Sequence, residues 1–175
     1  MTGKEFINSV ANGKSDIIQT LLDVLAEKGT RYCVIGGLGV NAYVEPVVSL
    51  DLDIVAAVED VEAVSATLAK RGLKVERFEH SVNVSSTESD LRIQLQTDAR
   101  YQEFLANGRM REVLGYKMNV ASPEDILRGK VWAYEDADRR RSKRQKDLAD
   151  ILRIVEVYPE LEKTLPESIR RKLNE

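Results

Sequence analysis

The stretch from Val34 to Val55 reads VIGGLGVNAYVEPVVSLDLDIV, and its pattern decides the fold. A short apolar strand runs into a Gly-Gly turn, a small helix follows, and a second strand is expected over residues 49–57. Because side chains alternate along a strand, Asp51 and Asp53 lie on one face, about 7 Å apart, while the apolar residues between them point into the core. The stretch therefore predicts a pair of carboxylates held beside a glycine turn.

Two carboxylates side by side on a sheet repel each other unless a cation lies between them. Oxygen ligands of this kind suit Mg²⁺ or Mn²⁺, which take few protein carboxylates and complete their shell with substrate phosphates. The paired glycines, Gly36 and Gly37, allow backbone N–H groups to approach a phosphate at the start of the following helix. The pattern predicts a site for a metal-chelated triphosphate. The alternative is an ordinary exposed strand preceded by glycines that only permit a tight turn.

The rest of the chain alternates strands and helices and then becomes helical. After a loosely held lead-in of 14 residues, Ser15 is expected to cap the first helix, and Ser122 a later one. The expected helices cover residues 15–28, 38–43, 59–72, 101–106, 122–134 and 141–158, with a short one after Pro166, and the later strands cover 73–78, 82–85, 91–96 and 116–120. This order predicts an α/β (α+β) fold: a mixed twisted β-sheet core, residues 15–121, and a helical C-terminal segment, residues 122–175, packed on it as one compact domain.

The composition is that of a globular protein with a substantial core: 175 residues, 43% hydrophobic and 31% charged. No apolar run reaches the roughly 18 residues of a membrane helix, and the first residues lack the apolar core of a signal peptide. We therefore expect a cytoplasmic protein without a membrane partner. One cysteine, Cys33, and one histidine, His80, exclude a disulfide framework and a metal site built from histidines or cysteines.

Positive charge is concentrated in one segment of an otherwise acidic chain. Residues 128–146 carry eight basic and three acidic side chains, while the whole chain has a net charge of −3. The most basic part, Arg139–Lys146, suits a polyanionic partner, but it equally suits a solvated helix face. It lacks interleaved aromatic residues, so stacking on single-stranded RNA has little support.

The Gly-Gly turn, the spacer and the Ser-x-Asp-x-Asp strand together resemble the nucleotidyltransferase superfamily, whose fold is shared with DNA polymerase beta. Residues 121–161, ASPEDILRGKVWAYEDADRRRSKRQKDLADILRIVEVYPEL, are similar to the helical tail of small bacterial members, including the abortive-infection (AbiEii-type) toxin group. In that group a helix that carries a lysine precedes a helix with the pattern Lys-Asp-x-x-Asp. The resemblance covers roughly residues 17–161.

This resemblance implies that Gly36, Gly37 and Ser49 hold the triphosphate of an NTP. It implies that Asp51 and Asp53 are catalytic and ligate Mg²⁺ (or Mn²⁺), so that two cations clamp the α-phosphate while an acceptor attacks in line. Phosphate neutralisation or orientation of the acceptor would fall to four tail residues: Lys130, Lys146, Asp147 and Asp150. Their residue types also allow a plainer interpretation, with a snorkelling lysine and with aspartates that pair with nearby basic residues such as Lys143, Lys146 or Arg153.

The third carboxylate of the superfamily, which helps bind the catalytic metal and takes the acceptor's proton, is missing from its expected place. It comes from a later strand, which here is Asp90–Asp98 (DLRIQLQTD), and its position is occupied by Gln94. An amide oxygen is a weaker ligand than a carboxylate and is no base. Asp90 and Asp98 lie on the same face but about 13 Å along an extended strand from Gln94, so a bend would be needed to bring either of them in.

Three functions compete on these observations. The leading hypothesis is a metal-dependent nucleotidyltransferase that moves an NMP from an NTP to an RNA, protein or small-molecule acceptor, and the tail suggests a toxin–antitoxin or phage-defence component with an antitoxin partner. The alternative is a catalytically inactive nucleotide-binding or interaction module that lost its third carboxylate at Gln94. The third is a polyanion-binding regulator that acts through Arg139–Lys146.

Overall fold

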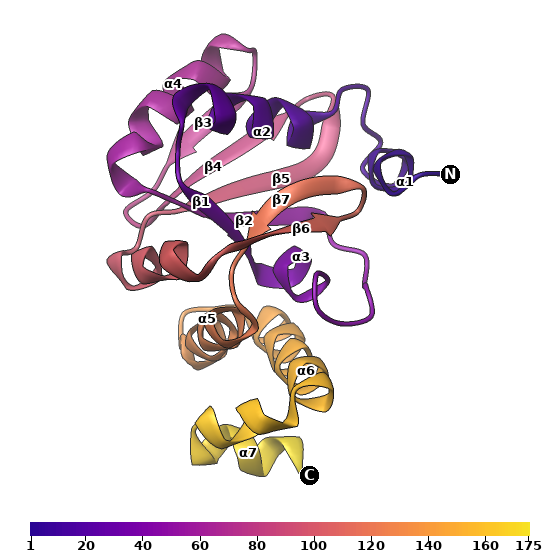
Figure 1. The fold of residues 1–175 in the computed structure, drawn as a ribbon, viewed down its shortest axis with the longest axis vertical. Helices are drawn as coiled ribbons and strands as arrows, with labels where there is room; N and C mark the ends of the chain where they lie inside the picture. Colours follow the sequence, from indigo (N-terminus) through magenta and orange to yellow (C-terminus); the bar gives the residue numbers. More distant parts are fainter.

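The computed structural model describes all 175 residues, and it contains one mixed sheet of seven strands in the order β3-β4-β5-β2-β1-β7-β6 (Figure 1). The strands are β1 (Tyr32–Ile35), β2 (Asp51–Ala56), β3 (Lys74–Arg77), β4 (Ser81–Ser86), β5 (Ser89–Gln96), β6 (Arg109–Val113) and β7 (Tyr116–Val120). Strand β1 is antiparallel to β2 and parallel to β7, while β2 is parallel to β5. The predicted mixed sheet with a helical C-terminal third is confirmed.

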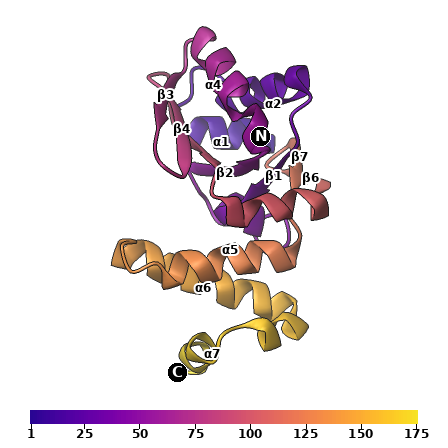
Figure 2. The ribbon, with the colours of Figure 1, turned by 90° about the vertical axis from the view of Figure 1, so that its left-hand side faces the viewer.

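Helices cover both faces of this sheet. They are α1 (Gly3–Val10), α2 (Ile17–Lys28), α3 (Gly36–Val40), α4 (Val61–Lys70), α5 (Pro123–Glu135), α6 (Arg141–Val157) and α7 (Glu167–Leu173), with 3₁₀ turns at Val58–Asp60, Ala99–Asn107 and Pro159–Thr164. Figure 2 shows α2 and α4 on one side of the sheet, α5 and α6 on the other, and α7 beyond them. None of the helices is both long and apolar enough to cross a membrane.

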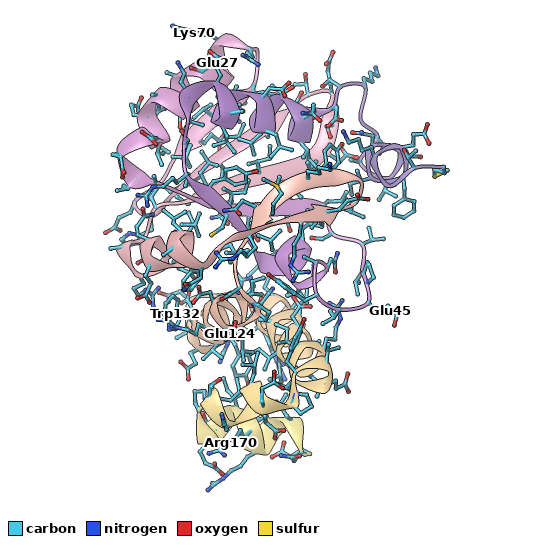
Figure 3. All side chains as sticks on the ribbon, viewed as in Figure 1. Glu27, Glu45, Lys70, Glu124, Trp132 and Arg170 are labelled. Carbon is cyan, nitrogen blue, oxygen red and sulfur yellow. The ribbon has the colours of Figure 1, made fainter.

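One continuous apolar core joins the sheet to the C-terminal helices. Leu52 and Ile54 of β2 are fully buried in it, as the strand alternation predicted, and Ile126 of α5 and Ile151 of α6 belong to the same cluster. At its edge, Trp132 of α5 stacks on an aromatic ring of the 3₁₀ turn Ala99–Asn107 (Figure 3). The helical tail is thereby fixed over one face of the sheet.

The helix ends follow local capping chemistry, with one shift from the prediction. Asp16, and not Ser15, caps α2, because its side chain accepts a hydrogen bond from the Gln19 N–H (3.0 Å). Gly29 ends α2 in the left-handed conformation, and the predicted Ser122 cap of α5 is confirmed by the bond that it accepts from the Asp125 N–H (3.1 Å). Serine and aspartate are both good N-caps, so the sequence alone does not decide between the neighbours Ser15 and Asp16.

Two elements were not predicted. The lead-in forms α1, which has a capping box between Thr2 and Glu5 and buries Ile7. It is too short for a convincing apolar stripe, and its contacts are tertiary: Asn8 donates a hydrogen bond to the Tyr116 hydroxyl (3.3 Å). Strand β6 is an edge strand whose first four residues are exposed, so it shows no apolar alternation.

Candidate functional site

The two aspartates of β2 project from the sheet face that α5 and α6 cover. The strand register pairs Asp53 of β2 with Gln94 of β5. Gln94 is in turn paired with Asn83 of β4, and Asn83 with Glu76 of β3. Asp53, Gln94, Asn83 and Glu76 therefore form one polar row across four strands. Neighbouring strands are about 4.8 Å apart, so Gln94 is the immediate neighbour of Asp53 and Glu76 lies about 14 Å away.

The Gly-Gly turn reaches this row through Gly36. Its φ of +66° is left-handed, and a Cβ added there would overlap the Asp53 carboxylate. Glycine is the residue that meets both conditions, because it adopts positive φ without strain and carries no side chain. Gly37 faces Ser49 instead, and a Cβ on Gly37 would lie 3.5 Å from the Ser49 hydroxyl, which is ordinary contact. The turn is thus fitted closely to Asp53 and more loosely to Ser49.

The two aspartates have different electrostatic surroundings. Burial raises the pKa of Asp53 and the charge of Asp51 adds to the rise, whereas nearby cations, chiefly Lys130, oppose it. Asp51 is instead held between two cations: Arg92 Nε lies 2.8 Å from Oδ1, and Lys143 Nζ lies 3.2 Å from Oδ2. Both oxygens of Asp51 therefore have a cationic partner, while the carboxylate of Asp53 is the desolvated one.

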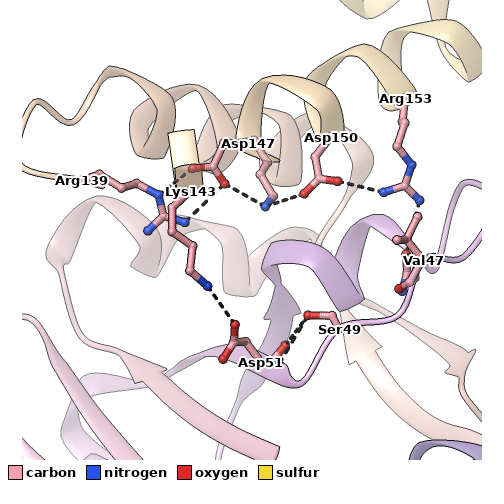
Figure 4. A network of polar contacts seen from close by, with 10 residues as sticks. Val47, Ser49, Asp51, Arg139, Lys143, Asp147, Asp150 and Arg153 are labelled. Atoms are coloured by element: carbon pink, nitrogen blue, oxygen red, sulfur yellow. Dashed lines mark hydrogen bonds and ion pairs between the residues drawn. The ribbon is translucent and has the colours of Figure 1, made fainter. Parts of the chain in front are cut away.

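The tail residues form a buried ion network between α5 and α6 (Figure 4). Lys130 Nζ lies 3.1 Å from the Asp147 carboxylate and 2.7 Å from that of Asp150. Arg139 binds Asp147 (2.6 Å) and Arg153 binds Asp150 (2.8 Å). All three central side chains, Lys130, Asp147 and Asp150, are less than a tenth exposed.

This network favours the structural interpretation of Lys130 and its two aspartates. Burial lowers the pKa of Lys130, but the carboxylates of Asp150 and Asp147 outweigh it and raise that pKa above its ordinary value. A lysine held in this way between two buried carboxylates cross-links the two helices, and its ammonium group already has two carboxylate partners. The expected pairing of Asp150 with Arg153 is present, but Asp147 pairs with Lys130 and Arg139.

Three cavities divide the predicted site residues among them, and two of the three are lined by an aspartate of the pair. A cavity of about 90 Å³ under α5 is lined by Gly36, Asp53, Gln94 and Lys130, among others. A second, of about 160 Å³, lies between α6 and the segment from α3 to the start of β2, and Gly37, Ser49 and Lys146 are among its lining residues. A third, of about 380 Å³, lies over β3, β4 and β5, where Asp51, Asp53 and Gln94 meet Arg92, Arg139 and Lys143. Asp53 and Gln94 line both the first and the third.

The two outlying candidates for the third carboxylate are not brought to the site. Asp98 caps the 3₁₀ turn after β5, accepting from the Arg100 N–H (2.9 Å) and pairing with the Arg100 side chain (3.0 Å). Asp90 accepts a hydrogen bond from Asn12 (2.6 Å) at the opposite end of the strand. Strand β5 is in regular register with β2 from Arg92 to Gln96, and its pairing with β4 shifts between Ile93 and Ser89, but this irregularity leaves Asp90 on Asn12 and not beside Gln94.

Sequence reasoning missed three basic side chains at this site: Arg92, Arg139 and Lys143. Arg92 had a usable signal, because it lies two residues before Gln94 and so shares its face. Arg139 and Lys143 were hidden in a basic segment for which a solvated face was the simpler interpretation. The structure splits that segment: Arg140, Arg141 and Lys146 are exposed, whereas Arg139 and Lys143 point inward to aspartates.

Comparison with known families agrees with this geometry. A family model described as aminoglycoside-2''-adenylyltransferase matches residues 17–146, roughly three quarters of the chain. The chain belongs to this family. It is thus a member of a nucleotidyltransferase family, as the Gly-Gly turn and the Asp-x-Asp strand indicated, and the match includes the sheet, α5 and the start of α6.

Solved structures of nucleotidyltransferases share the fold. ANT(2'')-Ia in complex with adenylyl-2''-tobramycin has 14% identity and a TM-score of 0.64, with 90% of this chain and 95% of that chain covered. The lincosamide adenylyltransferase LnuA, lincomycin-bound, has 15% identity and a TM-score of 0.56 over 82% and 99%. An antigenic nucleotidyltransferase-like protein from Paracoccidioides brasiliensis has 17% identity and a TM-score of 0.55 over 89% and 78%. A comparison with curated protein sequences found no match.

Proposed function

We propose that this member of the aminoglycoside-2''-adenylyltransferase family transfers a nucleoside monophosphate from an NTP to a small-molecule acceptor. The observation that carries the proposal is the close fit of Asp53 against the left-handed Gly36, with Asp51 beside it on the same strand face. The glycine turn offers backbone N–H groups to a phosphate, and the paired carboxylates offer oxygen ligands to the divalent cation that a polyphosphate carries.

The donor set of this site fits a single divalent cation that arrives with the nucleotide. Asp51 and Asp53 supply carboxylate oxygens and Gln94 an amide oxygen, and no cluster of three acidic, histidine or cysteine side chains is present. Mg²⁺ commonly takes one or two protein carboxylates and completes its shell with phosphates and water. When bound, such an ion would neutralise charge that develops on the transferred phosphoryl group.

The chain's own residues would bind and orient the triphosphate on the β1 side of the aspartate pair. Gly37, Ser49 and Lys146 line one cavity there, and Lys146 is exposed with no carboxylate partner of its own. A flexible lysine of this kind binds phosphate as a point charge. Lys130 lies deeper, and its role is to hold α6 above the site through Asp147 and Asp150.

Nucleotide binding tests the site directly. Calorimetric titration with ATP, with and without Mg²⁺, is carried out on the wild type and on the double variant Asp51→Asn/Asp53→Asn. The proposal expects Mg²⁺-dependent binding that the double variant loses by at least about tenfold, while Asp23→Asn, an exposed aspartate on α2, leaves it unchanged. Equal binding by wild type and double variant would contradict the proposal.

A catalytically inactive nucleotide-binding module is the second candidate, and Gln94 is the observation that favours it. Gln94 lies opposite Asp53 in the row where the superfamily's third carboxylate is expected, and an amide takes up no proton. Transfer of the labelled α-phosphate of ATP to an acceptor supports the enzyme. Mg²⁺-dependent ATP binding without transfer to any acceptor class supports the module.

The toxin–antitoxin or phage-defence role stays a hypothesis that rests on the tail pattern. In this chain the Lys-Asp-x-x-Asp residues Asp147 and Asp150 are buried partners of Lys130, which is a role in packing. Growth arrest on expression, lost in the Asp51→Asn/Asp53→Asn variant, would support that role, and unaffected growth would count against it.

A further inference from the structure

The cavity of about 380 Å³ over β3, β4 and β5 has a charge pattern that bears on the acceptor. Arg92 and Lys143 share the single carboxylate of Asp51, so this trio has a net charge of +1. Glu76, the remaining acid of the lining, pairs with Lys74 on its own strand. The lining as a whole holds three cations, Arg92, Arg139 and Lys143, and three carboxylates. With the aspartate pair occupied by a divalent cation, as the proposed function holds, the three cations face one remaining carboxylate, the half-exposed Glu76.

The position of this cavity suits an acceptor. In-line transfer places the attacking and the leaving oxygens on opposite sides of the transferred phosphorus. Gly37 follows β1, which is the neighbour of β2 on one side, and shares a cavity with Ser49, whereas the cavity with Arg92 lies on the other side of β2, over β5. If the leaving phosphates lie along Gly37 and Ser49, as the proposed function holds, the acceptor approaches across β5, past Gln94.

Apart from the aspartate pair, which the proposed function assigns to the cation, no general base lies within reach on that approach. Gln94 is the neighbour of Asp53, an amide cannot accept the acceptor's proton, and Glu76 is about 14 Å from Asp53 along the polar row. A hydroxyl acceptor needs a base, because its proton must leave as it attacks. A phosphate monoester needs none, because it is already largely doubly ionised at neutral pH, with a second pKa of about 6.

We propose, on the basis of the proposed function, that the attacking atom is a phosphate-monoester oxygen whose phosphate is bound by Arg92 and Lys143. That oxygen forms a bond to the α-phosphorus of the NTP, and the bond from this phosphorus to the oxygen that bridges to the β-phosphate breaks. Pyrophosphate leaves with the electron pair, no proton is transferred, and the product is a phosphoanhydride. An aminoglycoside carries several ammonium groups, and the same cations would repel it.

Binding of matched probes tests this inference separately from nucleotide binding. Glucose 1-phosphate, glucose and tobramycin are titrated calorimetrically into the wild type, both alone and with Mg²⁺ and α,β-methylene-ATP. We expect glucose 1-phosphate to bind at least about tenfold more tightly than glucose or tobramycin, because charge-assisted hydrogen bonds to Arg92 and Lys143 form with the phosphate alone. Arg92→Gln should weaken this binding about fivefold or more. Arg71→Gln should not, because Arg71 is an exposed arginine at the end of α4, the helix on the other side of the sheet (Figure 2), and pairs with Glu27.

A second variant tests the charge preference of the cavity by changing it in the opposite direction. Gln94→Asp adds a carboxylate and a base beside Asp53, so it should weaken glucose 1-phosphate binding and improve tobramycin binding.

The inference would be overturned if the wild type bound tobramycin more tightly than glucose 1-phosphate, or if Arg92→Gln bound glucose 1-phosphate as tightly as the wild type. If ATP binds in an Mg²⁺-dependent way but glucose 1-phosphate binds no better than glucose, this inference fails and the proposed function stands. If ATP does not bind, the proposed function fails, and the titration without nucleotide still reports the preference of the cavity.

Discussion

Replacing Lys130 by methionine should reduce stability strongly and weaken ATP binding by less than the loss of Lys146 does. The side chain is 8% exposed and lies within 3.1 Å of Asp147 and 2.7 Å of Asp150. Removing one partner of a buried ion pair typically costs about 3–5 kcal/mol, and the lower end applies because Arg139 and Arg153 remain on the two aspartates. A loss of about 3 kcal/mol lowers Tm by about 6–12 °C for a chain of this length.

The assay compares thermal unfolding and ATP affinity, with Lys146→Met as the matched control. Lys146 is on α6, is exposed and lines the cavity with Ser49, so its variant should shift Tm by less than about 2 °C and weaken ATP binding several-fold. Because the pKa of Lys130 is raised, its stabilisation is complete below the unfolded value of about 10.4 and is lost as pH rises through the folded value. The Tm difference between wild type and Lys130→Met should therefore shrink in strong alkali. An unchanged Tm with lost ATP binding at neutral pH would refute the structural role of Lys130.

Three further outcomes follow from the geometry. Gly36→Ala should destabilise by about 1–3 kcal/mol more than Gly29→Ala in urea unfolding, since both glycines are left-handed but only the former would overlap the Asp53 carboxylate. Asp53→Asn should raise Tm at pH 7, since burial raises the pKa of Asp53 and its ionised form is costly; this gain should shrink as pH falls through the folded pKa and be gone below the unfolded pKa. Nucleotide transfer by Asp53→Asn should fall at least about 10–100-fold. Cys33 is fully buried with its pKa raised to about 12, so disulfide reagents should label it no faster than the protein unfolds.

The sheet and most helices could be predicted because their signals are local. Alternation along β2 fixed the inward Leu52 and the outward aspartates, and the Ser122-Pro123 start of α5 is a side-chain cap that needs no tertiary contact. Helix α1 and strand β6 were missed because their stability comes from neighbours. An edge strand with exposed side chains and an eight-residue helix held by Tyr116 show no periodicity to detect.

The sequence predicts the site residues that lie on neighbouring strands, but it does not predict which helix residues contact them. Side-chain alternation predicts the sheet face on which Gln94 lies, and the position of Gln94 within β5 predicts its register. Gln94 is indeed paired with Asp53 of β2. The partners of Asp51 could not be found in this way, since Lys143 is 92 residues away in sequence and its orientation depends on how α6 crosses the sheet. Long-range ion pairs follow from the packing of helices, and a single sequence does not contain that packing.

The ion network explains why the lysine helix and the Lys-Asp-x-x-Asp helix occur together. Asp147 and Asp150 are three residues apart, so they lie on one face of α6, and Lys130 of α5 reaches both. Apolar contacts between two helices tolerate sliding, whereas a buried lysine between two carboxylates is costly at any other register. The same helix turn carries Lys143, whose ammonium group reaches Asp51. The network thus sets the height and rotation of α6, and through them it positions the Lys143 ammonium group against Asp51 of β2.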